Sequence, residues 1–102
     1  MASRPNIVFY FTDQQRPDTI GCYGQDLPIT PRLDAMAREG VRFERAFTPQ
    51  PVCGPCRAIF QTGRYATDTG CYRHDVLLPP GVKTLATYIY TAGYDTPHVS
   101  KC

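Results

Sequence analysis

The chain lacks tryptophan, has only two histidines and carries no excess of charge, since eleven basic and nine acidic residues give a formal net charge of +2. That balance gives no reason to expect a nucleic-acid partner. Long apolar runs are missing too, because the apolar residues 7–11 are too few for a signal-peptide core or a membrane span. We therefore expect a soluble, cytoplasmic protein with no membrane partner. Its 102 residues, 42% of them hydrophobic, exclude disordered, collagen-like and coiled-coil proteins.

The five cysteines are odd in number and follow no recognisable export signal, so they do not form the framework of a disulfide-rich secreted domain. We expect Cys22 and Cys71 to be buried or turn residues. A zinc site built from Cys53 and Cys56 would need a second pair at ligand spacing, which the other cysteines do not supply. No functional role is assigned to the two histidines, His74 and His98.

Two segments have the pattern of β-strands. Residues 6–12 form a continuous apolar run rich in β-branched and aromatic side chains, which is typical of a strand covered on both faces in a parallel sheet. Residues 41–47 alternate between apolar and charged side chains, which predicts a strand with one exposed face. A third candidate, residues 94–101, is interrupted by Pro97.

Three helices are predicted from their capping residues and terminal glycines: residues 31–39 between Thr30 and Gly40, residues 58–62 before Gly63, and a helix from Thr84 to Gly93. Residues 65–83 are expected to form a loop. No linker or repeat indicates a domain boundary inside the chain.

The tetrapeptide Cys53-Gly54-Pro55-Cys56 matches the active site of thioredoxins, in which a helix N-terminus stabilises the first thiolate. The rest of the chain fits that family poorly. Val52 stands where thioredoxins usually have tryptophan, and Gly63 ends the following helix too early. A thioredoxin-like oxidoreductase stays as an alternative interpretation.

A longer frame around the same cysteine resembles the signature of formylglycine-dependent sulfatases, in the alkaline-phosphatase-like superfamily. It reads Cys53-x-Pro55-x-Arg57-Ala58-x-x-x-Thr62-Gly63-Arg64. Further segments occur in the order and approximate spacing of that family: residues 5–8, 12–14, 21–24, 30–34, 40–43, 84–86 and 92–94. The resemblance implies an α/β fold, a three-layer sandwich with a mostly parallel sheet. Residues 1–102 would be the N-terminal portion of that domain.

The resemblance also implies a mechanism and its residues. A formylglycine-generating enzyme oxidises the cysteine equivalent to Cys53 to an aldehyde, and a hydroxyl of its hydrate attacks the sulfur of a sulfate ester. The second hydroxyl then lets the covalent sulfate leave. Arg57 resembles the arginine that stabilises the charge of the hydrate, and the adjacent helix N-terminus favours an anion. Arg64 is expected to brace the loop after the motif.

The metal ligands implied by the resemblance are Asp13, Gln14 and the modified Cys53. Asp13 matches the first metal-binding carboxylate of the family, whereas Gln14 stands where many members have a second aspartate. An amide oxygen still suits Ca²⁺, the expected ion, with Mg²⁺ or Mn²⁺ as alternatives. Phosphonate and phosphodiester hydrolases of the same superfamily also carry Asp-Gln here, so they stay as an alternative function.

Lys101 falls where sulfatases have a lysine that contacts the sulfate. The histidine that follows it in the family is absent here, so a sulfate contact and a plain surface lysine both stay open. The remaining metal ligands of the family come from a C-terminal portion that these 102 residues do not include. We therefore expect this chain alone to be inactive.

Overall fold

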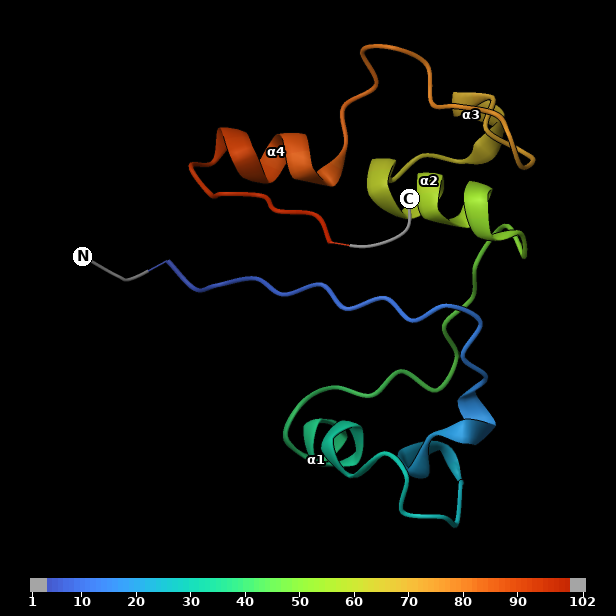
Figure 1. Ribbon diagram of the computed structural model, residues 1–102, viewed down its shortest axis with the longest axis vertical. Helices are drawn as coiled ribbons and strands as arrows, with labels where there is room; N and C mark the ends of the chain where they lie inside the picture. Colours follow the sequence, from blue (N-terminus) through green and yellow to red (C-terminus); the bar gives the residue numbers. More distant parts are fainter. Residues whose placement is uncertain (1–3, 100–102) are drawn as a thin grey trace. The chain divides into compact units, whose positions relative to one another are not determined.

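The computed structural model describes residues 4–99 and divides the chain into two compact units, Met1–Glu44 and Arg45–Cys102. The helical elements are η1 (Pro17–Thr19), η2 (Gly21–Tyr23), α1 (Pro31–Glu39), α2 (Cys53–Thr62), α3 (Ala66–Thr69) and α4 (Leu85–Thr91) (Figure 1). Of these, η1 and η2 are short 3-10 turns. No helix between residues 4 and 99 is long and apolar enough to cross a bilayer.

No β-strand forms between residues 4 and 99, so the strands predicted at residues 6–12 and 41–47 are not present in this structure. Residues 94–99 of the third candidate also form no strand, and its last two residues lie outside the described part. The reason is that a strand is defined by hydrogen bonds to a neighbour. An apolar pattern makes a segment fit for pairing, but no described segment forms a ladder with these three.

The segments predicted as strands expose their apolar side chains instead of burying them. Val8 is 88% exposed and Phe47 is 89% exposed. Phe9 and Phe11 lie on the same side of the chain with ring centroids 6.0 Å apart, as expected for residues two apart in an extended backbone. The α/β fold implied by the resemblance is therefore not seen in residues 4–99, which form helices and no strand.

Helix α1 has the predicted bounds, with Pro31 in its first turn and Gly40 after its last residue. The amide of Gly40 closes the helix by donating to the carbonyl of Met36 at 2.8 Å. Thr30 occupies the N-cap position but its side chain does not cap the helix. Its hydroxyl oxygen instead accepts from the amide of Gly21 at 2.8 Å, which ties the helix start to η2.

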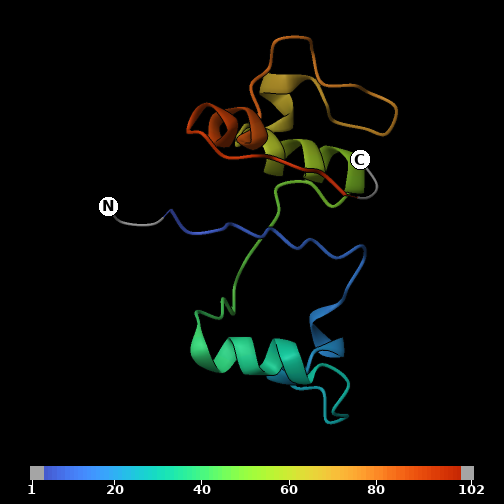
Figure 2. The ribbon, with the colours of Figure 1, turned by 60° about the vertical axis from the view of Figure 1, so that its left-hand side comes forward.

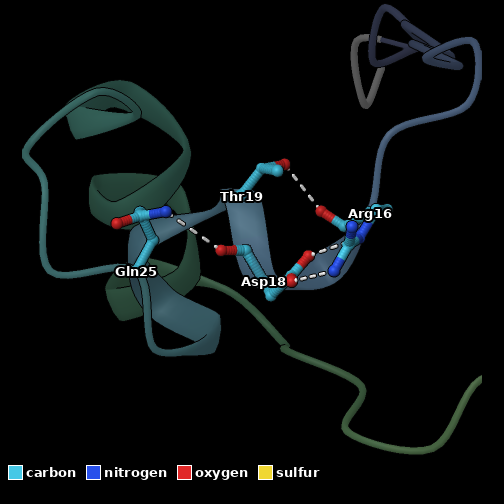
Figure 3. A network of polar contacts seen from close by, with 4 residues as sticks. All are labelled: Arg16, Asp18, Thr19 and Gln25. Atoms are coloured by element: carbon cyan, nitrogen blue, oxygen red, sulfur yellow. Dashed lines mark hydrogen bonds and ion pairs between the residues drawn. The ribbon is translucent and has the colours of Figure 1, made fainter.

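The first unit is held together by polar contacts around η1 and η2. Figure 3 shows the side chain of Arg16 paired with Asp18, with 3.0 Å between Nε and Oδ1. Gln25 reaches back from the end of η2 and donates to the carbonyl of Asp18 at 3.1 Å. The hydroxyl of Thr19 donates to the carbonyl of Arg16 at 2.7 Å. The Arg16 carbonyl also accepts from the Thr19 amide within the turn, so the Gln25 contact is the one that satisfies a further backbone carbonyl, that of Asp18.

In the second unit, α2 contacts both α3 and α4 (Figure 2). The buried residues of the described chain all lie in or beside α2 and α3: Pro55, Ala58, Ala66, Thr69 and Cys71. These side chains are small, so the buried core is small too. The loop predicted over residues 65–83 is interrupted by α3, whose four residues were too few to give a periodic signal.

Helix α4 begins as predicted, because Thr84 and Thr87 form a reciprocal capping box. The amide of Thr87 donates to the Thr84 hydroxyl at 3.4 Å, and the amide of Thr84 donates to the Thr87 hydroxyl at 3.3 Å. The helix ends before Gly93, which has a left-handed φ of 86°. The apolar side chains on one face of this segment are mostly uncovered, since only Ile89 is half-buried among Leu85, Tyr88, Ile89 and Ala92.

Candidate functional site

Helix α2 carries the cysteine frame and begins at Cys53. It starts earlier than residue 58, which the residue pattern predicted, and close to the helix N-terminus near Pro55 that the resemblance implies. Pro55 lies in the first turn, where its missing amide hydrogen costs nothing. The amide of Cys56 donates to the carbonyl of Val52 at 2.9 Å, which closes that turn. Cys53 is therefore the first residue of a ten-residue helix, at the end where the peptide dipoles favour negative charge.

The thiol of Cys53 is half-buried and lies beside the imidazole of His74. Its Sγ atom lies 3.9 Å from Nδ1 and 3.7 Å from Nε2. The same ring also covers Gly54, since a Cβ atom at that glycine would lie 3.5 Å from Nδ1 of His74. Sequence reasoning missed this contact, because the two residues are 21 positions apart and no spacing rule joins them.

A tight loop after α3 holds His74 in this place. Cys71 is only 4% exposed, and its thiol donates to the carbonyl of Val76 at 3.1 Å. Its amide donates to the Thr69 hydroxyl at 3.3 Å. Asp75 adopts a left-handed φ of 67°, which turns the chain directly after His74. The prediction that Cys71 is buried is confirmed, and Cys22 is half-buried in a turn.

Cys56 lies one helical turn after Cys53 and has a different partner. Its Sγ atom is 3.3 Å from the hydroxyl of Thr48. Both thiols are free, and no disulfide joins the described cysteines. Each thiol of the frame thus has its own polar neighbour.

Arg57 follows on α2, and its side chain is half-buried. The Nε atom is fully buried and makes no hydrogen bond within the described residues, whereas the side chain has interactions elsewhere. Arg64 is exposed just after the helix, and its amide donates to the Thr62 hydroxyl at 3.2 Å. The C-terminal glycine of the frame, Gly63, has a left-handed φ of 66° that ends α2.

Asp13 and Gln14 belong to the first unit, and Cys53 belongs to the second. Both residues of the first unit are exposed, and Gln14 has a left-handed φ of 49°. Within residues 4–99, no three His, Cys, Asp or Glu side chains gather into a group that could hold a metal ion. Lys101, the predicted sulfate contact, lies outside the described residues.

A hollow of about 510 Å³ lies in the first unit, lined in part by Gly21, Cys22, Asp34, Arg38 and Arg42. None of the predicted site residues lines it. The frame on α2 therefore stays the candidate site, on the strength of its chemistry and its geometry.

Comparison with known proteins decides between the two interpretations of that frame. The family model described as Sulfatase matches residues 5–102. The chain belongs to the sulfatase family. A thioredoxin-like oxidoreductase is not supported, because the match includes the whole cysteine frame and the segments on both sides of it.

Several sulfatases are similar to this chain over nearly its full length. An ulvan-active sulfatase of Formosa agariphila is 36% identical over 93% of the chain and 19% of its own length. An uncharacterized sulfatase of Escherichia coli is 39% identical over 96% of the chain and 20% of its own length. The steryl-sulfatase of Mus musculus is 34% identical over 95% of the chain and 17% of its own length.

The chain thus spans about one fifth of the length of the sulfatases it matches. No solved structure matches the chain. The resemblance to the sulfatase family predicted from the cysteine frame is confirmed. That family implies an α/β fold, whereas residues 4–99 show helices and no strand.

Proposed function

We propose that residues 53–64 form the modification and catalytic segment of a sulfuric ester hydrolase. The observation that carries this proposal is the position of Cys53. It is the first residue of α2, half-exposed, and followed in the same helix by Pro55 and Arg57 in the order of the sulfatase frame. The named relatives are sulfatases with different substrates, so the proposal extends to sulfate esters as a class.

Cys53 would be converted to formylglycine by a formylglycine-generating enzyme. In that conversion the C–S bond breaks and sulfur leaves as hydrogen sulfide. One atom of dioxygen becomes the aldehyde oxygen, and the other is reduced to water by two electrons and two protons from thiol reductants. The hydrated aldehyde supplies the nucleophilic hydroxyl for attack on sulfur. The N-terminus of α2 and the guanidinium of Arg57 favour the negative charge that gathers at this position.

Asp13 and Gln14 are proposed as part of a divalent-metal site, with Ca²⁺ preferred over Mg²⁺ and Mn²⁺. Their carboxylate and amide oxygens are ligands that Ca²⁺ accepts, and formylglycine would supply oxygen at Cys53 where the thiol cannot. Ca²⁺ takes about six to eight oxygen ligands, so these residues supply only a part of the set.

We also propose a substrate contact and a cellular compartment. Lys101 would contact the sulfate group of the ester, and the enzyme would work in the cytoplasm. A phosphonate or phosphodiester hydrolase is the second candidate, because Gln14 replaces the second carboxylate of many sulfatases. One negative charge fewer beside the metal changes which anionic ester the site tolerates best.

Intact-mass measurement after co-expression with a formylglycine-generating enzyme tests the proposal. We expect a loss of about 18 Da, located at Cys53 by peptide mapping, because a thiol becomes an aldehyde. The Cys56→Ala variant is the matched control and should lose the same mass. An unmodified Cys53 in a host that converts a known sulfatase would refute the proposed function.

A further inference from the structure

We propose that His74 is a positioning residue for residue 53 of the proposed sulfatase site. Its imidazole would hydrogen-bond the formylglycine formed from Cys53 and favour the hydrate over the free aldehyde. This inference rests on the proposed function, since it concerns the modified form of Cys53. It assigns a role to a histidine that the sequence pattern left without one.

The placement of the ring supports this role. Both ring nitrogens lie within 3.9 Å of the Cys53 Sγ atom, and the ring extends over Gly54 as well. The oxygens of formylglycine replace Sγ on the same Cβ atom. The imidazole therefore faces the atoms that change when Cys53 is modified.

The loop that carries His74 is fixed on both sides of the ring. Before it, the buried Cys71 holds the chain through its hydrogen bonds to Thr69 and Val76. After it, Asp75 makes a left-handed turn. The His74 side chain itself is exposed. A backbone that is fixed on both sides still lowers the entropy cost of ordering the ring when it makes a hydrogen bond.

The hydrogen-bonding capacity of imidazole explains the preference for the hydrate. A neutral imidazole offers one N–H donor and one nitrogen acceptor. A free aldehyde has only an acceptor oxygen, whereas its hydrate has two hydroxyl groups that both donate and accept. The ring can thus make a hydrogen bond to the hydrate that the aldehyde cannot match, and it shifts the equilibrium toward the hydrate.

The test measures how fast an aminooxy probe labels the converted chain at constant pH. The probe condenses with the free aldehyde to an oxime and releases water, so its rate follows the fraction of free aldehyde. We expect His74→Phe to accelerate labelling about fivefold, the effect of losing one ordinary hydrogen bond. Phenylalanine keeps a ring of similar size, so access of the probe to residue 53 is preserved.

Two further variants distinguish this role from a general structural effect. His74→Asn keeps a donor and an acceptor, and its labelling rate should stay within about twofold of the original chain. His98→Phe, which changes the other histidine, should leave the rate unchanged. Labelling of His74→Phe at the original rate, or equal acceleration in all three variants, would overturn the inference.

The contact itself is measurable in the unmodified chain, without any variant. A nuclear Overhauser effect should join the Cβ protons of Cys53 to the ring protons of His74, and its absence would overturn the inference. The two proposals also fail differently. A Cys53 that is never converted removes the proposed function and this inference with it, whereas conversion with unchanged labelling kinetics removes the inference alone.

Discussion

Asp34 links α1 to η2, and Gly21 leaves the space that its carboxylate needs. The carboxylate accepts from the amide of Cys22 at 2.7 Å and from the hydroxyl of Thr30 at 3.3 Å. A Cβ atom at Gly21 would lie 2.4 Å from Oδ2 of Asp34, closer than real Cβ contacts allow. A Cβ atom at this position would therefore push the carboxylate away from its hydrogen-bond partners.

We therefore expect Gly21→Ala to displace the Asp34 carboxylate and destabilise the first unit by about 1–3 kcal/mol, the cost of leaving part-buried donors unsatisfied. Amide hydrogen exchange at Cys22 should become faster by a factor of about five or more. In the double variant Gly21→Ala/Asp34→Ala the clash is gone. Its loss of stability should therefore be smaller than the sum of the losses in the two single variants. Unchanged exchange at Cys22 in Gly21→Ala would contradict this account.

Among the elements, the seven-residue α4 depends most on its cap, because a helix this short is marginal by itself. Its capping box satisfies two amide groups at once, those of Thr84 and Thr87. Few of its side chains are covered, so packing contributes little to holding it.

Thr84→Ala should weaken α4 by about 1 kcal/mol, whereas Thr84→Ser should be nearly neutral since serine caps equally well. The Cα chemical shifts of residues 85–91 report the helical fraction. Thr91→Ala is the matched control, because the Thr91 hydroxyl donates to Tyr88 within the last turn and caps nothing. An equal loss of helicity in both alanine variants would exclude a special role for the cap.

On the scale of the whole molecule, apolar surface is abundant and the buried core is small. Side chains such as Val8, Phe43 and Phe47 are largely exposed, while the buried apolar residues of the described chain are small ones around α2 and α3. Domains that bury little apolar area are marginal. The chain also spans about one fifth of the length of its sulfatase relatives.

We accordingly expect this chain alone, even with Cys53 converted and Ca²⁺ added, to release no product from chromogenic aryl sulfates or aryl phosphonate monoesters. The physical reason is that Asp13, Gln14 and the modified Cys53 would supply only part of the about six to eight oxygen ligands that Ca²⁺ takes. A Cys53→Ala chain sets the background rate of the assay. Product released above that rate would contradict the expectation, and the ester that reacts would identify the class of hydrolase.

Local chemistry explains which elements the sequence could predict. The ends of α1, α2 and α4 were predicted at Gly40, Gly63 and Gly93, because a helix ends through contacts within a few residues. The prediction of strands at residues 6–12 and 41–47 was wrong, since neither segment forms a strand in this structure. A strand forms only when a second segment pairs with it. An apolar pattern shows that a segment is suited to a sheet, but it does not show whether a partner segment is present.

For the candidate site, the sequence by itself determined the Cys53 frame and the family that it indicates, and from these it predicted which residue would be modified. Only the tertiary structure decided that Cys53 begins a helix and that His74 lies against its thiol. Residue types and spacings along the chain encode what a segment can do, but a contact across 21 positions depends on how an intervening loop folds. That loop is held by the buried Cys71 and by the turn at Asp75, neither of which has a distinctive sequence signal.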